Sequence, residues 1–161
     1  MISDETLKKF RDFFVNSQQG TGRENHFSSV GLTVLDIQSG WAAMSFASAP
    51  HLAGNPVTGA VGAGPVIALL DTCCAMAAAT CGDEIRLSPT LDLRVDFLGP
   101  ANAGCPVFAE AKAYRKSRFV VFTEGFAYQD DKQQPLARAT INFTPIDQAI
   151  LKPKPAGQGR A

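Results

Sequence analysis

The stretch GAVGAGPVIALLDTCCAMAAATCG, residues 59–82, consists of small and apolar residues with a single charge, Asp71. Pro65 suits a first helical turn, where its missing N–H costs nothing, and Gly82 is a typical stop signal, so we predict a helix over residues 65–81. Because this helix has almost no polar face, we expect it to be buried and surrounded by other elements. A membrane span is the alternative, but the Ala- and Gly-rich composition and the carboxylate argue against it.

The length and charge of the chain limit the kinds of protein it can be. At 161 residues it suits one domain, which we expect at residues 1–146 with its core at 30–145, followed by a flexible tail at 147–161 that carries Pro, Gly and Lys without periodicity. Lys plus Arg and Asp plus Glu both number 15, so no net charge favours nucleic acid or an anionic membrane as partner. The amino terminus has no basic start followed by an apolar run, which predicts no secretory signal and a cytoplasmic location.

The four cysteines do not indicate a cofactor. Cys73 and Cys74 are adjacent, and Cys81 lies on the same predicted helix, which is neither metal-ligand spacing nor a C-x-x-C redox pair. We expect reduced core thiols, no metal and no other cofactor. The chain also lacks the G-x-S-x-G, H-E-x-x-H and phosphate-loop motifs, which argues against serine hydrolases, zinc proteases and phosphate-loop enzymes.

Periodicity predicts the remaining elements. Asp4 can cap a helix over residues 5–15, and residues 18–26 read as a polar loop. Strands are predicted at 30–37, 41–48, 90–97, 107–114, 119–128 and 136–144. The alternation is cleanest in the 90–97 strand, which predicts one polar face and one buried face; the polar face is Thr90, Asp92, Arg94 and Asp96, and the buried face is Leu91, Leu93, Val95 and Phe97.

The order of these elements restricts the fold. A ferredoxin-like domain needs a second crossover helix late in the chain, and cystatin-like folds place their main helix before the strands. The short links between strands require antiparallel neighbours. We therefore predict an α+β fold in which an antiparallel sheet of about six strands wraps around one long central helix, with a short N-terminal helix.

Four stretches carry a family resemblance. They are GNPVTG at 54–59, ALLDT at 68–72, PTLDLRVDFLGPA at 89–101 and PLARATINF at 135–143. Together they make residues 30–143 resemble the hotdog-fold acyl-CoA thioesterases of the phenylacetic-acid-degradation (PaaI-like) family. The resemblance implies a hotdog fold, hydrolysis of an acyl-CoA thioester, and a homodimer or a dimer of dimers (homotetramer) whose active site lies between subunits.

The resemblance also implies candidate catalytic residues. In that family a loop asparagine precedes a His-Gly-Gly turn that opens the helix, and an acidic residue two turns along performs the chemistry; Asn55 and Asp71 match this pattern. The resemblance assigns Asp71 to activating water or attacking directly, Asn55 to orienting water or substrate, and the Thr90 hydroxyl to orienting water. For Asp71 the alternative is a structural carboxylate at an oligomer seam, and for Asn55 it is a turn residue.

The helix-start turn departs from the family, because the His-Gly-Gly positions read Gly62-Ala63-Gly64 here. The amides of Ala63 and Gly64 can still present N–H groups at the start of a helix, where the dipole favours a developing oxyanion. The substrate would then lie against Gly62 and these amides. The missing histidine leaves a non-catalytic acyl- or CoA-binding hotdog module as the alternative function, and it makes a hydratase the weaker third choice.

A basic cluster of Arg115, Lys116, Ser117 and Arg118 falls at a predicted strand turn. Arginine binds phosphate in a bidentate manner, so this turn is a candidate contact for the phosphates of coenzyme A. A solvated hairpin tip is the alternative.

Overall fold

The computed structural model describes residues 2–20 and 25–145, so the predicted tail at 147–161 lies outside the described residues. The elements in chain order are α1 (Asp4–Gly20), α2 (His26–Val30), β1 (Thr33–Gln38), β2 (Trp41–Phe46), a short 3-10 helix η1 (Pro50–Leu52), α3 (Ala63–Ala79), β3 (Thr90–Phe97), β4 (Val107–Lys116), β5 (Val121–Tyr128) and β6 (Ala137–Phe143).

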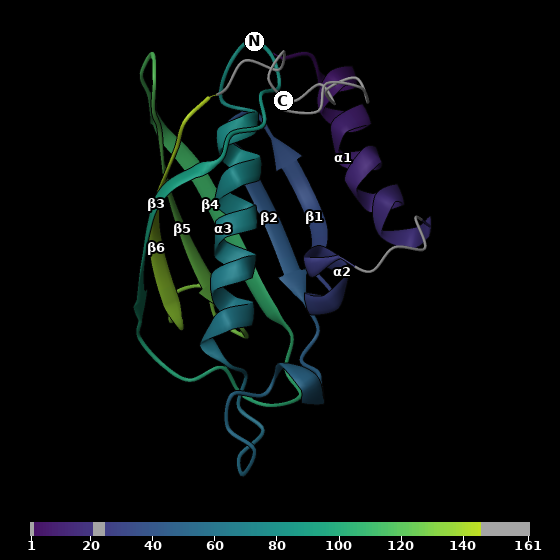
Figure 1. The fold of residues 1–161 in the computed structure, drawn as a ribbon, viewed down its shortest axis with the longest axis vertical. Helices are drawn as coiled ribbons and strands as arrows, with labels where there is room; N and C mark the ends of the chain where they lie inside the picture. Colours follow the sequence, from purple (N-terminus) through teal and green to yellow (C-terminus); the bar gives the residue numbers. More distant parts are fainter. Residues whose placement is uncertain (1, 21–24, 146–161) are drawn as a thin grey trace, which may run out of the picture.

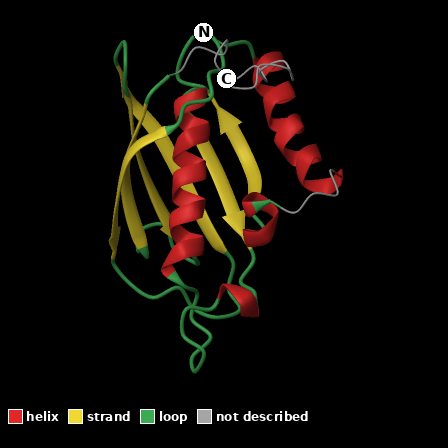
Figure 2. Ribbon diagram, viewed as in Figure 1, coloured by secondary structure: helices red, strands yellow, loops and turns green. Residues whose placement is uncertain are grey.

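The strands form one sheet in the order β1-β2-β4-β5-β6-β3, and every neighbouring pair is antiparallel. The helix α3 lies across one face of this sheet (Figures 1 and 2). The helix α1 lies beside β1, at the edge of the sheet opposite to β3 (Figure 1). The predicted α+β hotdog fold, with six strands curved around a central helix, is therefore confirmed.

Small residues allow α3 to lie close to the sheet. In β4, Ala109 and Ala111 face the core and are only 1% and 2% exposed. A Cβ on Gly125 of β5 would lie 3.0 Å from the sulfur of Cys74 on α3, so the sheet has no room for a larger residue there. Dense contact of this kind forms the core.

The end of α3 is fixed by a buried threonine. The Thr80 hydroxyl donates to the carbonyl of Gln38 (2.9 Å) and accepts from the N–H of Gly40 (3.2 Å), which ties α3 to the turn between β1 and β2. The helix therefore spans Ala63–Ala79 instead of the predicted 65–81.

The N-terminal segment contains more helix than predicted. The predicted N-terminal helix is present as α1, but it ends at Gly20 and not at residue 15. The prediction also missed α2. Asn25 and Ser28 form a reciprocal capping box, which starts this helix at the end of the expected loop. As a result β1 begins at Thr33 and not at residue 30.

The strand β3 has the predicted bounds, but its expected buried face is wrong. It is the edge of the sheet, and Leu91, Leu93 and Phe97 are 54%, 36% and 47% exposed. Alternation predicts which side chains share a face, but it cannot show whether the same chain covers that face. In this chain the side chains of Leu91, Leu93 and Phe97 remain exposed to solvent.

Candidate active site

Asp71 lies in the middle of α3 and is half-buried. Its Oδ1 accepts a 2.8 Å hydrogen bond from the hydroxyl of Thr90, the first residue of β3. Asp71 and Thr90, two residues 19 positions apart to which the family resemblance gave roles, are thus in direct contact. A hydrogen bond from a neutral donor to a carboxylate fixes its orientation and leaves its second oxygen available to another donor.

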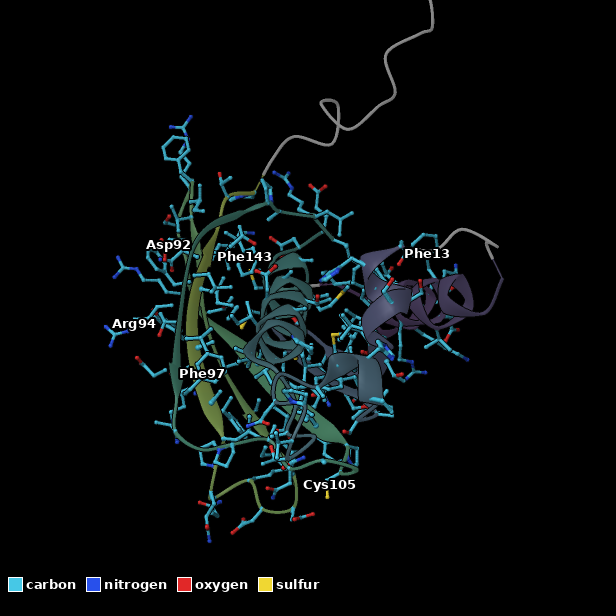
Figure 3. All side chains as sticks on the ribbon, turned by 60° about the horizontal axis from the view of Figure 1, so that its bottom comes forward. Phe13, Asp92, Arg94, Phe97, Cys105 and Phe143 are labelled. Carbon is cyan, nitrogen blue, oxygen red and sulfur yellow. The ribbon has the colours of Figure 1, made fainter. Side chains whose placement is uncertain are left out.

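A β-bulge turns Thr90 toward the helix. Thr90 pairs with Phe143 and Asp92 pairs with Asn142, so Leu91 is an extra residue between two consecutive pairs. Without that extra residue Thr90 would share a face with Asp92, as the alternation predicted. Figure 3 shows Asp92 on the side of β3 away from α3, whereas Phe143 lies on the side that faces the helix. The predicted placement of Thr90 on the polar face was therefore wrong.

The helix start presents backbone donors to solvent. Gly62 caps α3 without any side-chain hydrogen bond, and Ala63 and Gly64 are exposed. The N–H of Gly62 itself donates to the carbonyl of Leu52 (2.8 Å), so the amides of Ala63 and Gly64 are the ones that a ligand can use. A Cβ on Gly64 would meet nothing within 4 Å.

The loop before α3 is held in a fixed shape. A Cβ on Gly54 would lie 2.6 Å from the Cα of Gly62, so only glycine fits there. The side-chain oxygen of Asn55 accepts from the amides of Val57 (2.8 Å) and Thr58 (3.1 Å), which is an Asx turn. Asn55 thus supports the loop that carries the helix start, while its role toward a substrate stays a prediction.

One chain does not bring the two halves of the candidate site together. Asp71 is eight residues beyond Ala63 on the same helix, and eight residues correspond to about 12 Å along the axis. Oxyanion donors act at about 3 Å from the oxygen they stabilise, and an attacking group starts at a similar distance from the carbonyl carbon. The carboxylate and the amides of one helix therefore cannot act on the same carbonyl.

The basic cluster forms the tip of the β4–β5 hairpin, at the opposite end of α3 from its first residue (Figure 1). Arg115, Lys116 and Arg118 are exposed. Ser117 has a structural role, because its N–H and its hydroxyl both bond to the carbonyl of Val120 and its Oγ accepts the N–H of that residue. The cations are adjacent in the chain, but the sheet register separates two of them, because Arg115 pairs with Phe122 and Lys116 pairs with the buried Val121. Arg115 and Lys116 therefore lie on opposite faces, and contact of the cluster with a ligand stays a prediction.

The cysteines of α3 are packed in the core. Cys73 and Cys74 are both fully buried. Burial raises the pKa of Cys74 to about 12 and also raises that of Cys73.

Residues 2–20 and 25–145 contain no group of three His, Cys, Asp or Glu that could hold a metal ion. In the same described residues, no helix has the length and apolar character needed to cross a membrane.

Comparison with known proteins identifies the family. The sequence model of the thioesterase superfamily matches residues 59–136. A crystal structure of a Pseudomonas aeruginosa protein is 32% identical, with a TM-score of 0.72, over 88% of this chain and 99% of that one. The chain belongs to the thioesterase superfamily.

Within that superfamily the chain is similar to PaaI-like proteins. A phenylacetic acid degradation-related protein of Ralstonia eutropha is 25% identical, with a TM-score of 0.66, over 82% of this chain and 98% of that one. Escherichia coli PaaI, from the phenylacetic acid degradation operon, shares the fold at 17% identity, with a TM-score of 0.71, over 88% of this chain and 96% of that one. No curated protein sequence matches the chain. The predicted PaaI-like hotdog relationship is confirmed.

The sequence reasoning missed one exposed side chain beside the candidate residues. Phe119 follows the basic cluster, is 66% exposed, and lies under the guanidinium of Arg118 at 5.1 Å. The sequence prediction made Phe119 the first residue of the strand at 119–128, next to the turn at 115–118. Only the start of β5 at Val121 shows that Phe119 belongs to the turn.

Proposed function

We propose that this protein hydrolyses an acyl-CoA thioester to a free acid and coenzyme A. The observation that carries the proposal is the hydrogen bond from Thr90 to Asp71, because it orients a half-buried carboxylate on the central helix of a thioesterase fold. With Oδ1 held by Thr90, Oδ2 can take a proton from a water molecule that attacks the thioester carbonyl. The tetrahedral intermediate then collapses with cleavage of its C–S bond, and the departing thiolate of coenzyme A takes the proton that Asp71 removed from the water.

The carbonyl oxygen would be stabilised by the amides of Ala63 and Gly64. These donors need no side chain, so the absence of a histidine at Gly62 does not remove them. Because they lie about 12 Å along the helix from Asp71 of the same chain, we propose that they come from a second copy. The reaction needs only water, a carboxylate and backbone donors, so we propose that it proceeds without a cofactor.

The second copy would pair with the exposed edge of the sheet. The strand β3 has an unpaired backbone edge and carries exposed apolar side chains, which an edge strand normally avoids. A two-fold contact between β3 and its counterpart would extend the sheet and cover Leu91, Leu93 and Phe97. We therefore propose a homodimer with two sites at its interface; assembly into a dimer of dimers stays a prediction, as does the cytoplasmic location.

The test is a panel of short, medium and aromatic acyl-CoAs with detection of the released thiol. We expect turnover of at least one of them. The alternative is a binding module without catalysis, which the Gly62-Ala63-Gly64 turn suggested. Saturable binding of acyl-CoA with no thiol release across the panel would favour that alternative and contradict the proposal.

A further inference from the structure

The two adjacent cysteines of α3 touch different strands of the sheet. The sulfur of Cys73 lies 3.3 Å from the carbonyl oxygen of Ala42 in β2 and 3.7 Å from that of Ala109 in β4. The sulfur of Cys74 lies over β5, where a Cβ on Gly125 would come within 3.0 Å of it. Both thiols are fully buried. Successive side chains of a helix point about 100° apart, so these two contacts together fix the rotation of α3 about its axis.

Thr123 connects Cys74 to the strand that positions Thr90. The thiol of Cys74 contacts the hydroxyl of Thr123, which is itself fully buried and donates a 2.7 Å hydrogen bond to the carbonyl of Ile141 in β6. Two residues further along β6, Phe143 pairs with Thr90. The depth of α3 and the position of Thr90 are therefore both set against the same short stretch of β6.

Cys74 is close to Asp71 as well. It lies three residues further along α3, at the spacing of neighbours on a helix surface, and the charge of Asp71 acts on its thiol. The helix packs mainly on β2, β4 and β5 and little on β3, so the contact of Asp71 with Thr90 depends on where the other strands hold α3. A separation of about 3.6 Å is no longer a hydrogen bond, so a shift of less than about 1 Å at Cys74 would break the 2.8 Å contact.

We propose that Cys74, held by Thr123, is a positioning residue for Asp71. It fixes the rotation and depth of α3 at which the carboxylate accepts the hydrogen bond of Thr90. The inference rests on the proposed function for its effect on the rate of hydrolysis. It also gives the two adjacent cysteines different roles, because Cys73 contacts β2 and β4, which are further from β3 in the sheet.

The first test compares truncation of the two thiols. Cys74→Ala removes the sulfur, so α3 can shift toward β5, and we expect kcat to fall about tenfold with KM unchanged. Cys73→Ala removes an equally buried sulfur and is the matched control; it should lower the melting temperature by a similar amount and leave kcat unchanged. Cys74→Ser keeps a group that can hydrogen-bond to Thr123 and should retain most of the activity.

A double variant separates positioning from a general loss of stability. If Cys74 acts through the contact between Thr90 and Asp71, adding Cys74→Ala to Thr90→Val should cause no further fall in kcat. Thr123→Val removes the link to β6 and should reproduce the effect of Cys74→Ala, so it replaces Cys74→Ala in both comparisons if that variant does not fold. An unchanged kcat in Cys74→Ala, or a further tenfold fall in the double variant, would overturn the proposal.

Crystal structures of the same variants separate this proposal from the proposed hydrolysis. We expect the distance between Thr90 Oγ1 and Asp71 Oδ1 to exceed about 3.5 Å in Cys74→Ala and to stay near 2.8 Å in Cys73→Ala. If the wild type hydrolyses no thioester but the distance lengthens only in Cys74→Ala, the hydrolysis proposal fails and the positioning role stands. If thioesters are hydrolysed and the distance stays the same in both variants, the positioning role fails alone.

Discussion

Thr90 and Asp71 are joined by a 2.8 Å hydrogen bond that exists only because β3 begins with a bulge. The extra residue Leu91 moves the threonine from the outer face of the sheet to the helix side. β-Bulges often re-aim a side chain near active sites.

Replacement of Thr90 by valine keeps its shape and removes the hydrogen bond to Asp71. Hydrogen bonds to charged groups contribute about 1.5–3 kcal/mol, so we expect kcat to fall about 10- to 100-fold. Thr140→Val is the control, because Thr140 is exposed on the outer side of β6. Steady-state kinetics of both variants is the measurement; equal effects of the two changes would show that the contact has no catalytic role.

Asp71→Asn should lower the rate of hydrolysis by about two to four orders of magnitude, the range for loss of a general base. The amide oxygen can still accept the Thr90 hydrogen bond, and a neutral group is easier to bury than a charge, so denaturant unfolding should show equal or higher stability. Asp96→Asn, at an exposed position of β3, is the control and should keep its activity. Loss of the fold in Asp71→Asn would show that the carboxylate is structural.

Gly64 and Gly54 should respond differently to added side chains. A Cβ on Gly64 meets nothing within 4 Å, so Gly64→Val should fold normally while its side chain obstructs the helix-start amides and lowers kcat by about 10²-fold. A Cβ on Gly54 would collide with Gly62, so Gly54→Ala should lower the melting temperature. Unchanged turnover in Gly64→Val would place the oxyanion site elsewhere.

The assembly can be tested at the edge strand. We expect the wild type to sediment as a dimer or larger at micromolar concentration, and Phe97→Lys to sediment as a monomer with little hydrolysis, because a lysine on each copy disrupts the paired edges. Leu35→Lys places the same change on the opposite edge strand, where Leu35 is 47% exposed, and should stay assembled. A monomeric wild type would contradict both the dimer and the shared site.

The buried thiols predict a dependence of stability on high pH. Burial holds the pKa of Cys74 at about 12 against an ordinary 9.0, so the folded state keeps this proton while the unfolded state loses it above pH 9. The contribution of this thiol to the free energy of unfolding is therefore fully present below pH 9. It falls by about 1.4 kcal/mol per pH unit as the pH rises from 9 toward 12. Denaturant unfolding measures the free energy of unfolding of wild type and Cys74→Ala at pH 8 and pH 10. We expect a larger loss between the two pH values in the wild type; an equal loss in both proteins would contradict this prediction.

The sequence by itself determined the central helix, the strand order along the chain and the antiparallel sheet, because short links and hydrophobic periods are local signals. It also selected Asp71, since a single carboxylate in an apolar helix stands out against its neighbours. The capping box that starts α2 was equally local, and it was missed only because the surrounding residues are polar.

Only the tertiary structure decided which of the selected residues act together. The bulge at Leu91 depends on how β3 pairs with β6, and no alternation within one strand encodes it. The exposure of Phe97 depends on which strand is last in the sheet, which is a property of all six strands. The separation of Lys116 from Arg115 likewise follows from pairing with β5. Contacts between residues distant in the chain set these features, so they appear only when the sheet is closed around α3.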